Sequence, residues 1–225
     1  MGTMISFPRT TRGTAQGYLA EAKEAKAPGV VVIQEWWGLQ SQIKATCDRL
    51  AEAGFTALAP DLYEGKVVPY HDGAAAANAA MSTLDFKAAT AEIVRGAVRH
   101  LKARGPKVGL TGFCMGGAVA VIGAVHIPEV DAAVTFYGLP PEEVAAPKDV
   151  RVPLQGHFAT KDDWCTPDVV NAFEQKLKTA KKRYELYRYE AHHAFMNSDR
   201  KEVYDPRAAK LAWERCVAFF ESELG

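Results

Sequence analysis

The fold is decided by residues 108–125, which read VGLTGFCMGGAVAVIGAV. A short apolar run over 108–111 leads into the turn GFCMGG at 112–117, and an alanine- and valine-rich segment over 118–125 follows. This is the strand–turn–helix context of a Gly-x-nucleophile-x-Gly sequence, with cysteine where serine usually stands. Glycine is needed on both sides because the nucleophile occupies a sharp, strained turn, in which larger side chains would collide with the neighbouring strand or helix.

The thiol of Cys114 is the candidate nucleophile. We expect the turn to lift it above the edge of a sheet, where the helix that begins at Met115 directs its free amides and positive dipole end at the sulfur. The alternative is a buried structural cysteine, because free cysteine often behaves as a small hydrophobic residue. The flanking glycines and the preceding strand favour the functional interpretation.

The length of 225 residues fits one α/β domain over residues 1–225. Hydrophobic residues make up 48% of the chain and charged residues 24%, which is ordinary for a globular protein that buries a substantial core. Lys and Arg number 27, as do Asp and Glu, so the formal net charge is zero. Without a basic stripe, we expect no nucleic-acid partner.

The cysteines are widely spaced and form no Cys-x-x-Cys pair, which indicates separate reduced thiols rather than a disulfide framework or a zinc site. They are Cys47, Cys114, Cys165 and Cys216. No apolar run approaches the length of a membrane span, and the N-terminus lacks a signal-peptide core. We therefore expect a cytoplasmic protein with no membrane partner.

Strand-like and helix-like segments alternate along the chain, which predicts a mostly parallel central sheet with helices on both faces. An antiparallel edge hairpin is expected over 5–20. The expected strands are 30–33, 55–59, 108–111, 132–136, 150–155 and 184–187, and the expected helices are 43–53, 85–103, 118–125, one opened by Thr166-Pro167, and 206–221. Residues 61–84 fit a small lid near the site.

A cysteine nucleophile needs a base to take its proton and an acid to orient that base. In α/β hydrolases the acid and then the histidine follow the nucleophile along the chain. Here Asp162 and Asp163 follow the strand expected to end near 155, and His192 and His193 follow the strand expected to end near 187. Each motif alone is weak, but together they follow consecutive strands in the right order. Catalytic groups of open α/β sheets gather at these carboxyl ends.

Glu35 directly follows the apolar run 30–33, and Trp36 and Trp37 come next. The non-functional interpretation of Glu35 is an exposed loop carboxylate. Two adjacent tryptophans indicate a partly dry environment, which would raise the pKa of the carboxyl. The loop after this strand is also where an α/β hydrolase finds its second oxyanion amide.

Taken together, these features resemble the dienelactone hydrolase (carboxymethylenebutenolidase) family over nearly the whole chain. The most specific motifs are Gln34-Glu35, Ala59-Pro60-Asp61-Leu62-Tyr63, the cysteine turn at 112–117, Phe136-Tyr137-Gly138 and His193-Ala194-Phe195. The resemblance implies a single α/β-hydrolase domain. It also implies hydrolysis of ester or lactone bonds, as in the conversion of dienelactone to maleylacetate.

The resemblance implies Cys114 as nucleophile, His193 as base and Asp162 as acid. Counting back from Pro167 would instead place the acid at Asp163, and we favour Asp162 because the strand fixes position better than a loop. His193 is preferred to His192 because it heads the His-x-Phe motif. The resemblance further implies that Glu35 pairs with the resting cysteine and helps to take its proton.

The backbone amides of Met115 and Trp36 would then form the oxyanion hole. Trp37, Tyr137 and Trp164 are candidates to line the substrate pocket. Family members that hydrolyse dienelactone carry an arginine four residues after the catalytic histidine, and here that position is Asn197. An amide cannot form arginine's bidentate pair with a substrate carboxylate, although Arg200 lies close in sequence.

The sequence therefore predicts a cysteine-dependent hydrolase of a small-molecule ester or lactone that works through an acyl-thioester. No metal or organic cofactor is implied, and we expect a monomer. One alternative is a broader carboxylesterase or thioesterase that acts on uncharged acyl substrates. Another is a non-catalytic protein of the same fold that binds a ligand or senses oxidants through Cys114.

Overall fold

The computed structural model describes residues 1–225 and contains one eight-stranded sheet in the order β1-β2-β4-β3-β5-β6-β7-β8. The strands are β1 (Thr3–Pro8), β2 (Thr14–Ala20), β3 (Gly29–Ile33), β4 (Thr56–Pro60), β5 (Val108–Phe113), β6 (Ala132–Phe136), β7 (Leu154–Lys161) and β8 (Tyr184–His192). β1 and β2 form the expected antiparallel edge hairpin, and β2 is also antiparallel to β4. The remaining pairings are all parallel, which confirms the predicted fold class.

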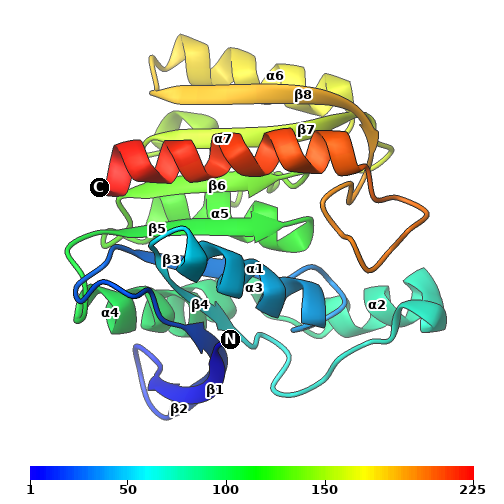
Figure 1. Ribbon diagram of the computed structural model, residues 1–225. Coiled ribbons are helices and arrows are strands. Elements are labelled where there is room, and N and C mark those ends of the chain that lie inside the picture. The colour runs from blue at the N-terminus through cyan, green and yellow to red at the C-terminus, as the bar shows by residue number, and fades with distance from the viewer.

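Helices cover both faces of this sheet (Figure 1). They are α1 (Ser41–Glu52), α2 (Gly73–Ser82), α3 (Phe86–Ala88), α4 (Arg95–Lys102), α5 (Met115–His126), α6 (Pro167–Thr179) and α7 (Pro206–Leu224), with the short turns η1 (Tyr70–Asp72) and η3 (Pro147–Asp149) and the π-helical η2 (Ala89–Val94). α1 and α7 cover one face, and η2, α4, α5 and α6 cover the other.

The β3 strand shows how the sequence builds both layers. Val30 and Val32 belong to the hydrophobic cluster under α1 and α7, whereas Val31 and Ile33 belong to the cluster under α4, α5 and α6. Successive side chains of a strand point to opposite faces, so a run without polar residues serves two cores at once. All five residues of β3 are buried, as the sequence predicts.

Two helix starts follow from local chemistry. The Thr166 hydroxyl accepts a hydrogen bond from the amide of Val169, and Pro167 occupies the first turn of α6. The Asp205 carboxylate accepts from the amides of Arg207 and Ala208 at the start of α7. Such caps satisfy amides that have no partner inside the helix.

β7 and β8 extend beyond the predicted ends at residues 155 and 187. The reason is an aromatic row across the sheet, in which the buried His157 ring stacks between Phe136, 4.6 Å away, and Tyr187, 5.6 Å away. Burial lowers the pKa of His157 to about 3, so this histidine is neutral and packs like an aromatic residue. A polar residue type therefore continues the strand instead of ending it.

Residues 85–103 do not form the single regular helix that was expected. Their helical path is divided into α3, the π-helical η2 and α4. Residues 61–84, for which the sequence predicts a small lid, contain η1 and α2. In Figure 1, α2 lies at the same end of the sheet as the loop between β8 and α7.

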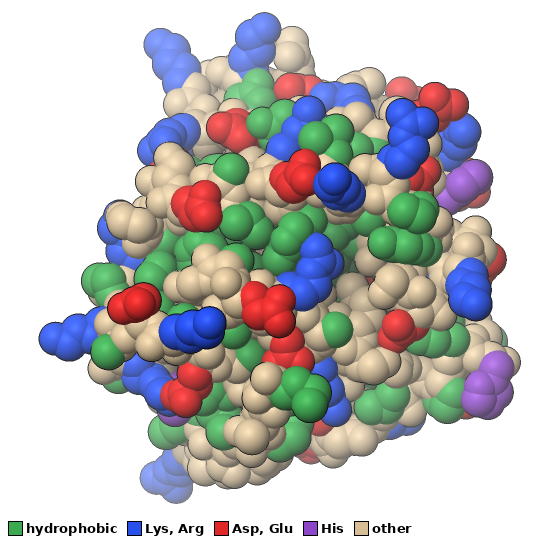
Figure 2. All heavy atoms as spheres, in the orientation of Figure 1, with side chains coloured by type: hydrophobic (Ala, Val, Ile, Leu, Met, Phe, Trp, Pro, Cys, Tyr) green, Lys and Arg blue, Asp and Glu red, His purple; other side chains and the backbone are tan.

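Acidic and basic side chains are interspersed on the face that carries α1 and α7 (Figure 2), in keeping with a net charge of zero. None of the helices combines the length and the hydropathy needed to cross a bilayer.

Candidate active site

The candidate nucleophile stands in a strained turn between β5 and α5. Cys114 has φ 56° and ψ −118°, a region that non-glycine residues rarely occupy. A Cβ on Gly112 would lie 2.0 Å from the carbonyl oxygen of Gly116, and a Cβ on Gly116 would lie 2.4 Å from that of Ile33. The two glycines therefore let the turn close, and the strained backbone holds the thiol at the end of the sheet.

The base and the acid follow the ends of the next strands. Asp162 is the first residue after β7, and His193 is the first residue after β8. His193 Nδ1 and Asp162 Oδ2 are 2.8 Å apart, and the other oxygen of Asp162 accepts the amides of Trp164, at 2.8 Å, and Cys165, at 3.0 Å. The Asp163 side chain is exposed and makes no hydrogen bond to His193. Of the two candidate acids, the structure thus brings Asp162 to the histidine.

The charges in this cluster support one another. Burial raises the pKa of Asp162, but the hydrogen bonds from His193 and from the two amides outweigh burial and hold the pKa below its usual value. Burial also lowers the pKa of His193, yet its hydrogen bonds to Asp162 and Cys114 outweigh that effect and raise the pKa to about 10. The site therefore stabilises a protonated imidazole beside the sulfur.

Glu35 is buried, with 2% of its surface exposed, and it is held by two donors. The side-chain amide of Asn197 donates to one oxygen at 2.7 Å, and the Tyr137 hydroxyl donates to the other at 3.2 Å. Burial raises the pKa of the carboxyl, as expected, and the hydrogen bonds and the charge of His193 only partly offset it. The pairing with the resting cysteine that the resemblance implies stays a prediction; the hydrogen bonds of this carboxylate are with an amide and a phenol.

Asn197 also ties this carboxyl to the segment that contains η1 and α2. Its side-chain amide donates to the Tyr70 hydroxyl at 3.3 Å, and its carbonyl accepts the amide of Asp199 at 3.2 Å. In the sequence, Asn197 stands out only as the position where the family's arginine is missing. Its role as the partner of Glu35 had no sequence signal, because the two residues are 162 positions apart.

The two amides expected in the oxyanion hole make no hydrogen bond within the chain, so both are free to bind an anion. They belong to Trp36, after β3, and to Met115, at the start of α5. The Tyr63 hydroxyl donates to the carbonyl of Trp36 at 3.1 Å and lies 3.5 Å from the sulfur of Met115. Tyr63 thus connects the two residues. Tyr63 belongs to the motif at residues 59–63, but the motif does not predict its contacts with Trp36 and Met115.

Two cavities meet at Cys114 and His193, and Trp36 and Trp164 also line both of them. The first, which we call the polar cavity, has a volume of about 470 Å³, and its other walls include Glu35, Trp37, Tyr70, Lys161, Arg200 and Glu202. The second, which we call the apolar cavity, has a volume of about 500 Å³, and its other walls include Met81, Phe86, Ile122, Leu139, Val144 and Val169.

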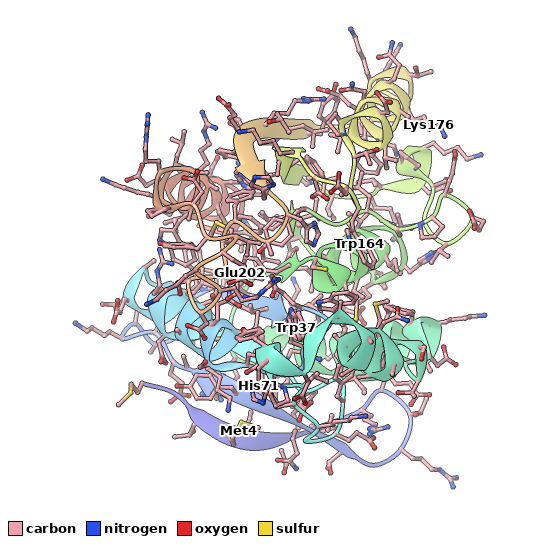
Figure 3. All side chains as sticks on the ribbon, turned by 90° about the vertical axis from the view of Figure 1, so that its right-hand side faces the viewer. Met4, Trp37, His71, Trp164, Lys176 and Glu202 are labelled. Atoms are coloured by element: carbon pink, nitrogen blue, oxygen red, sulfur yellow. The ribbon has the colours of Figure 1, made fainter.

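Figure 3 looks onto the carboxyl ends of the strands, where the labelled Trp37, Trp164 and Glu202 lie close together. Of the three pocket candidates, Trp37 lines the polar cavity, Tyr137 the apolar cavity and Trp164 both. The Tyr137 ring stands 5.0 Å from that of His193, edge to face. The Arg200 guanidinium is paired with Glu202 at 2.8 Å and lies over the ring of Trp37.

The sequence model of the dienelactone hydrolase family matches residues 15–224. The chain belongs to this family. "Protein usf" of Aquifex pyrophilus is 38% identical over 233 residues, and an Aquifex aeolicus protein named "Putative carboxymethylenebutenolidase" is 37% identical over 236 residues. Both alignments cover 100% of this chain and of the relative.

A solved structure bears out the same membership. The crystal structure named "Putative Dienelactone Hydrolase" from Klebsiella pneumoniae superposes with a TM-score of 0.86 at 28% identity. The superposition covers 98% of this chain and 99% of that one. The expectation of a hydrolase similar to dienelactone hydrolases is thus confirmed. This member of the dienelactone hydrolase family carries Asn197 against Glu35 at the centre of its site.

Proposed function

We propose that this enzyme hydrolyses esters and lactones with Cys114 as its nucleophile. The observation that carries the proposal is the 2.8 Å contact between His193 and Asp162, beside a thiol held in a strained turn. A nucleophile, a base within reach and an acid that orients the base are the parts that acyl transfer requires. The free amides of Met115, at this turn, and of Trp36, after β3, add the site where negative charge would develop.

In the acylation half, His193 takes the proton of the Cys114 thiol, and the sulfur attacks the carbonyl carbon of the ester. The carbonyl oxygen becomes an oxyanion, which the amides of Met115 and Trp36 bind. His193 keeps the proton because its pKa is raised to about 10, and it then donates that proton to the departing alkoxide oxygen. The carbon–oxygen bond breaks, and an acyl-thioester on Cys114 remains.

In the deacylation half, His193 acts in the opposite direction. The neutral imidazole takes a proton from a water molecule, whose oxygen attacks the thioester carbon. The same two amides bind the second oxyanion. The carbon–sulfur bond then breaks, the carboxylic acid leaves, and Cys114 regains its proton from His193. No redox change is involved, and one water is consumed in each cycle.

We propose that Glu35 acts as a second proton acceptor for the thiol. Its raised pKa supports this role, because a buried carboxylate gains by taking up a proton. The charge of His193 acts on Glu35, so the two groups lie in one electrostatic environment. Glu35→Gln should slow the alkylation of Cys114 by iodoacetamide, and an unchanged rate would exclude the role.

For the substrate, we propose uncharged esters in place of dienelactone itself. Asn197 offers no positive charge to a substrate carboxylate, and its amide nitrogen is already bonded to Glu35. Arg200 is neutralised by Glu202. A broader carboxylesterase or thioesterase is therefore the better-supported member of the enzyme class, because the apolar cavity adjoins the nucleophile.

The deciding experiment is a hydrolysis panel of dienelactone, neutral aryl esters and thioesters, run on the wild type and on Cys114→Ala. Turnover that is lost in Cys114→Ala supports the proposal, whereas an equal rate in both proteins would refute it.

Since a thiol nucleophile must stay reduced, and all four cysteines are free, we also propose a reducing compartment such as the cytoplasm. We propose that the enzyme works as a monomer, which its sedimentation will test.

A further inference from the structure

We propose that the apolar cavity holds the acyl chain of the substrate, while the polar cavity receives the leaving group and the deacylating water. This inference rests on the proposed hydrolysis at Cys114. It names the substrate class: esters and thioesters whose acyl part is an uncharged aliphatic or aryl chain. The two cavities share the nucleophile and the base, so one substrate can extend from the reacting carbon into both.

The walls of the apolar cavity suit a hydrocarbon chain. Ile122 comes from α5, Val169 from α6, and Leu139 and Val144 from the segment after β6. No aspartate, glutamate, lysine or arginine lines this cavity, whose titratable side chains are the shared His193 and Cys114 and the buried Cys165 and Tyr137. A charged acyl group would lose its hydration there without gaining a partner, so uncharged acyl chains are favoured.

Exposed apolar side chains mark the mouth of the apolar cavity. Val144 and Val169 are 42% and 48% exposed, and Trp164, which lines both cavities, is 61% exposed. Apolar groups gathered around a concave site indicate a ligand that covers them. A volume of about 500 Å³ falls within the usual range for small-molecule sites.

The polar cavity differs because charged side chains share its wall with the rings of Trp36, Trp37 and Trp164. Lys161, Asp163, Glu202 and Arg200 line it together with the exposed His192. Such walls hold water. The water that cleaves the thioester must give its proton to His193, the group that earlier protonated the leaving oxygen, so it arrives where the leaving group departed.

The acyl group, in contrast, stays bound to Cys114 through both half-reactions. A site that buries it can stabilise both transition states without blocking the access of water. The assignment of the acyl chain to the apolar cavity and of the leaving group to the polar cavity follows from this difference.

The test compares p-nitrophenyl acetate, butyrate and hexanoate, which share one leaving group. Each buried methylene should raise kcat/KM by up to about fourfold. Val169→Asp places a charge at the cavity mouth and should lower the hexanoate-to-acetate ratio about tenfold, by removing the gain of one to two methylenes. The third position of α6 tolerates aspartate, since acidic residues are favoured near a helix N-terminus. Leu211→Asp is the matched control, because Leu211 is 42% exposed on α7 and lines neither cavity.

A second series varies the alcohol of acetate esters from ethyl to hexyl. It shows which of the two cavities binds the alcohol part of the substrate. Val169→Asp should leave the chain-length dependence of this series unchanged. A loss confined to the alcohol series would overturn the assignment of the two cavities.

Disulfide formation between Cys114 and methyl, butyl or hexyl methanethiosulfonate tests the cavity without turnover, because the thiolate attacks the alkylthio sulfur and methanesulfinate leaves. Labelling, followed by mass spectrometry, should accelerate with chain length in the wild type and in Leu211→Asp but not in Val169→Asp. Labelling that depends on chain length without any ester hydrolysis would refute the proposed hydrolase and leave the apolar cavity as the chain-binding site. Hydrolysis that is lost in Cys114→Ala but indifferent to acyl length would overturn the cavity proposal alone.

Discussion

Replacing Asp162 by asparagine removes the one charge that orients the proposed base while keeping the shape of the loop. The Oδ1 atom of asparagine can still accept the amides of Trp164 and Cys165, at 2.8 and 3.0 Å in the native protein. The new amide nitrogen then faces His193 Nδ1, which lies 2.8 Å from the native carboxylate. Because that amide can only donate, the imidazole must present its proton on Nε2 and cannot take one there.

The expected loss follows from these contacts. A hydrogen bond to a charged group contributes about 1.5–3 kcal/mol, and the wrong tautomer removes general base catalysis as well. We expect kcat/KM for p-nitrophenyl butyrate to fall about 10³- to 10⁴-fold, the scale known for the same change in a serine protease triad. The melting temperature should fall by several degrees only, since about 1 kcal/mol corresponds to about 2–4 °C in a chain of this size.

Asp163→Asn is the matched comparison, because Asp163 is the alternative acid: it makes the same chemical change one residue away, on an exposed wall residue of the polar cavity that has no hydrogen bond to His193. It should retain at least about half of the wild-type rate, because the hydrogen bond that orients His193 comes from Asp162 and is left intact. Stopped-flow hydrolysis and circular dichroism melting of both variants give the comparison. Equal losses in the two variants, or a loss of less than tenfold in Asp162→Asn, would refute the assignment of the acid.

Three further outcomes are expected. Because the pKa of His193 is raised to about 10, its proton is present below that pH and lost above it, so kcat/KM for alkyl esters should fall as the pH rises through about 10. In Asp162→Asn this limb should move to lower pH. Tyr63→Phe removes the hydroxyl that connects the two oxyanion residues and should lower kcat about tenfold with little change in KM, as steady-state kinetics will show. Gly138→Ala would place a Cβ 1.9 Å from the carbonyl oxygen of Cys114, and urea unfolding should report a loss of about 3 kcal/mol or more.

Much of the catalytic arrangement is legible in the sequence because it depends on local chemistry. The glycines at 112 and 116 predict a turn with no room for a Cβ at these positions. In the structure, a Cβ on either residue would collide with a backbone carbonyl oxygen. The order of acid and histidine along the chain predicts their positions because parallel strands end at one edge. Asp162 and His193 follow their strands even more closely than predicted, since β7 and β8 continue to residues 161 and 192.

Features that depend on distant contacts could not be predicted. His157 extends a strand because Phe136 and Tyr187 stack on it from the neighbouring strands. Glu35 is bonded to Asn197, and the division of the substrate site into two cavities depends on side chains from α2, α5, α6 and several loops. Periodicity and spacing report which face a residue occupies, but they do not report which residue stands opposite it.

The direct test of the central claim is to trap the acyl group on the enzyme. The wild type is mixed with p-nitrophenyl butyrate, quenched in acid within milliseconds and digested, and the peptides are analysed by mass spectrometry. We predict a butyryl thioester on the peptide that contains Cys114, formed together with a burst of p-nitrophenol equal to the enzyme concentration. Butyryl on another residue, or turnover that persists at the wild-type rate in Cys114→Ala, would contradict the account.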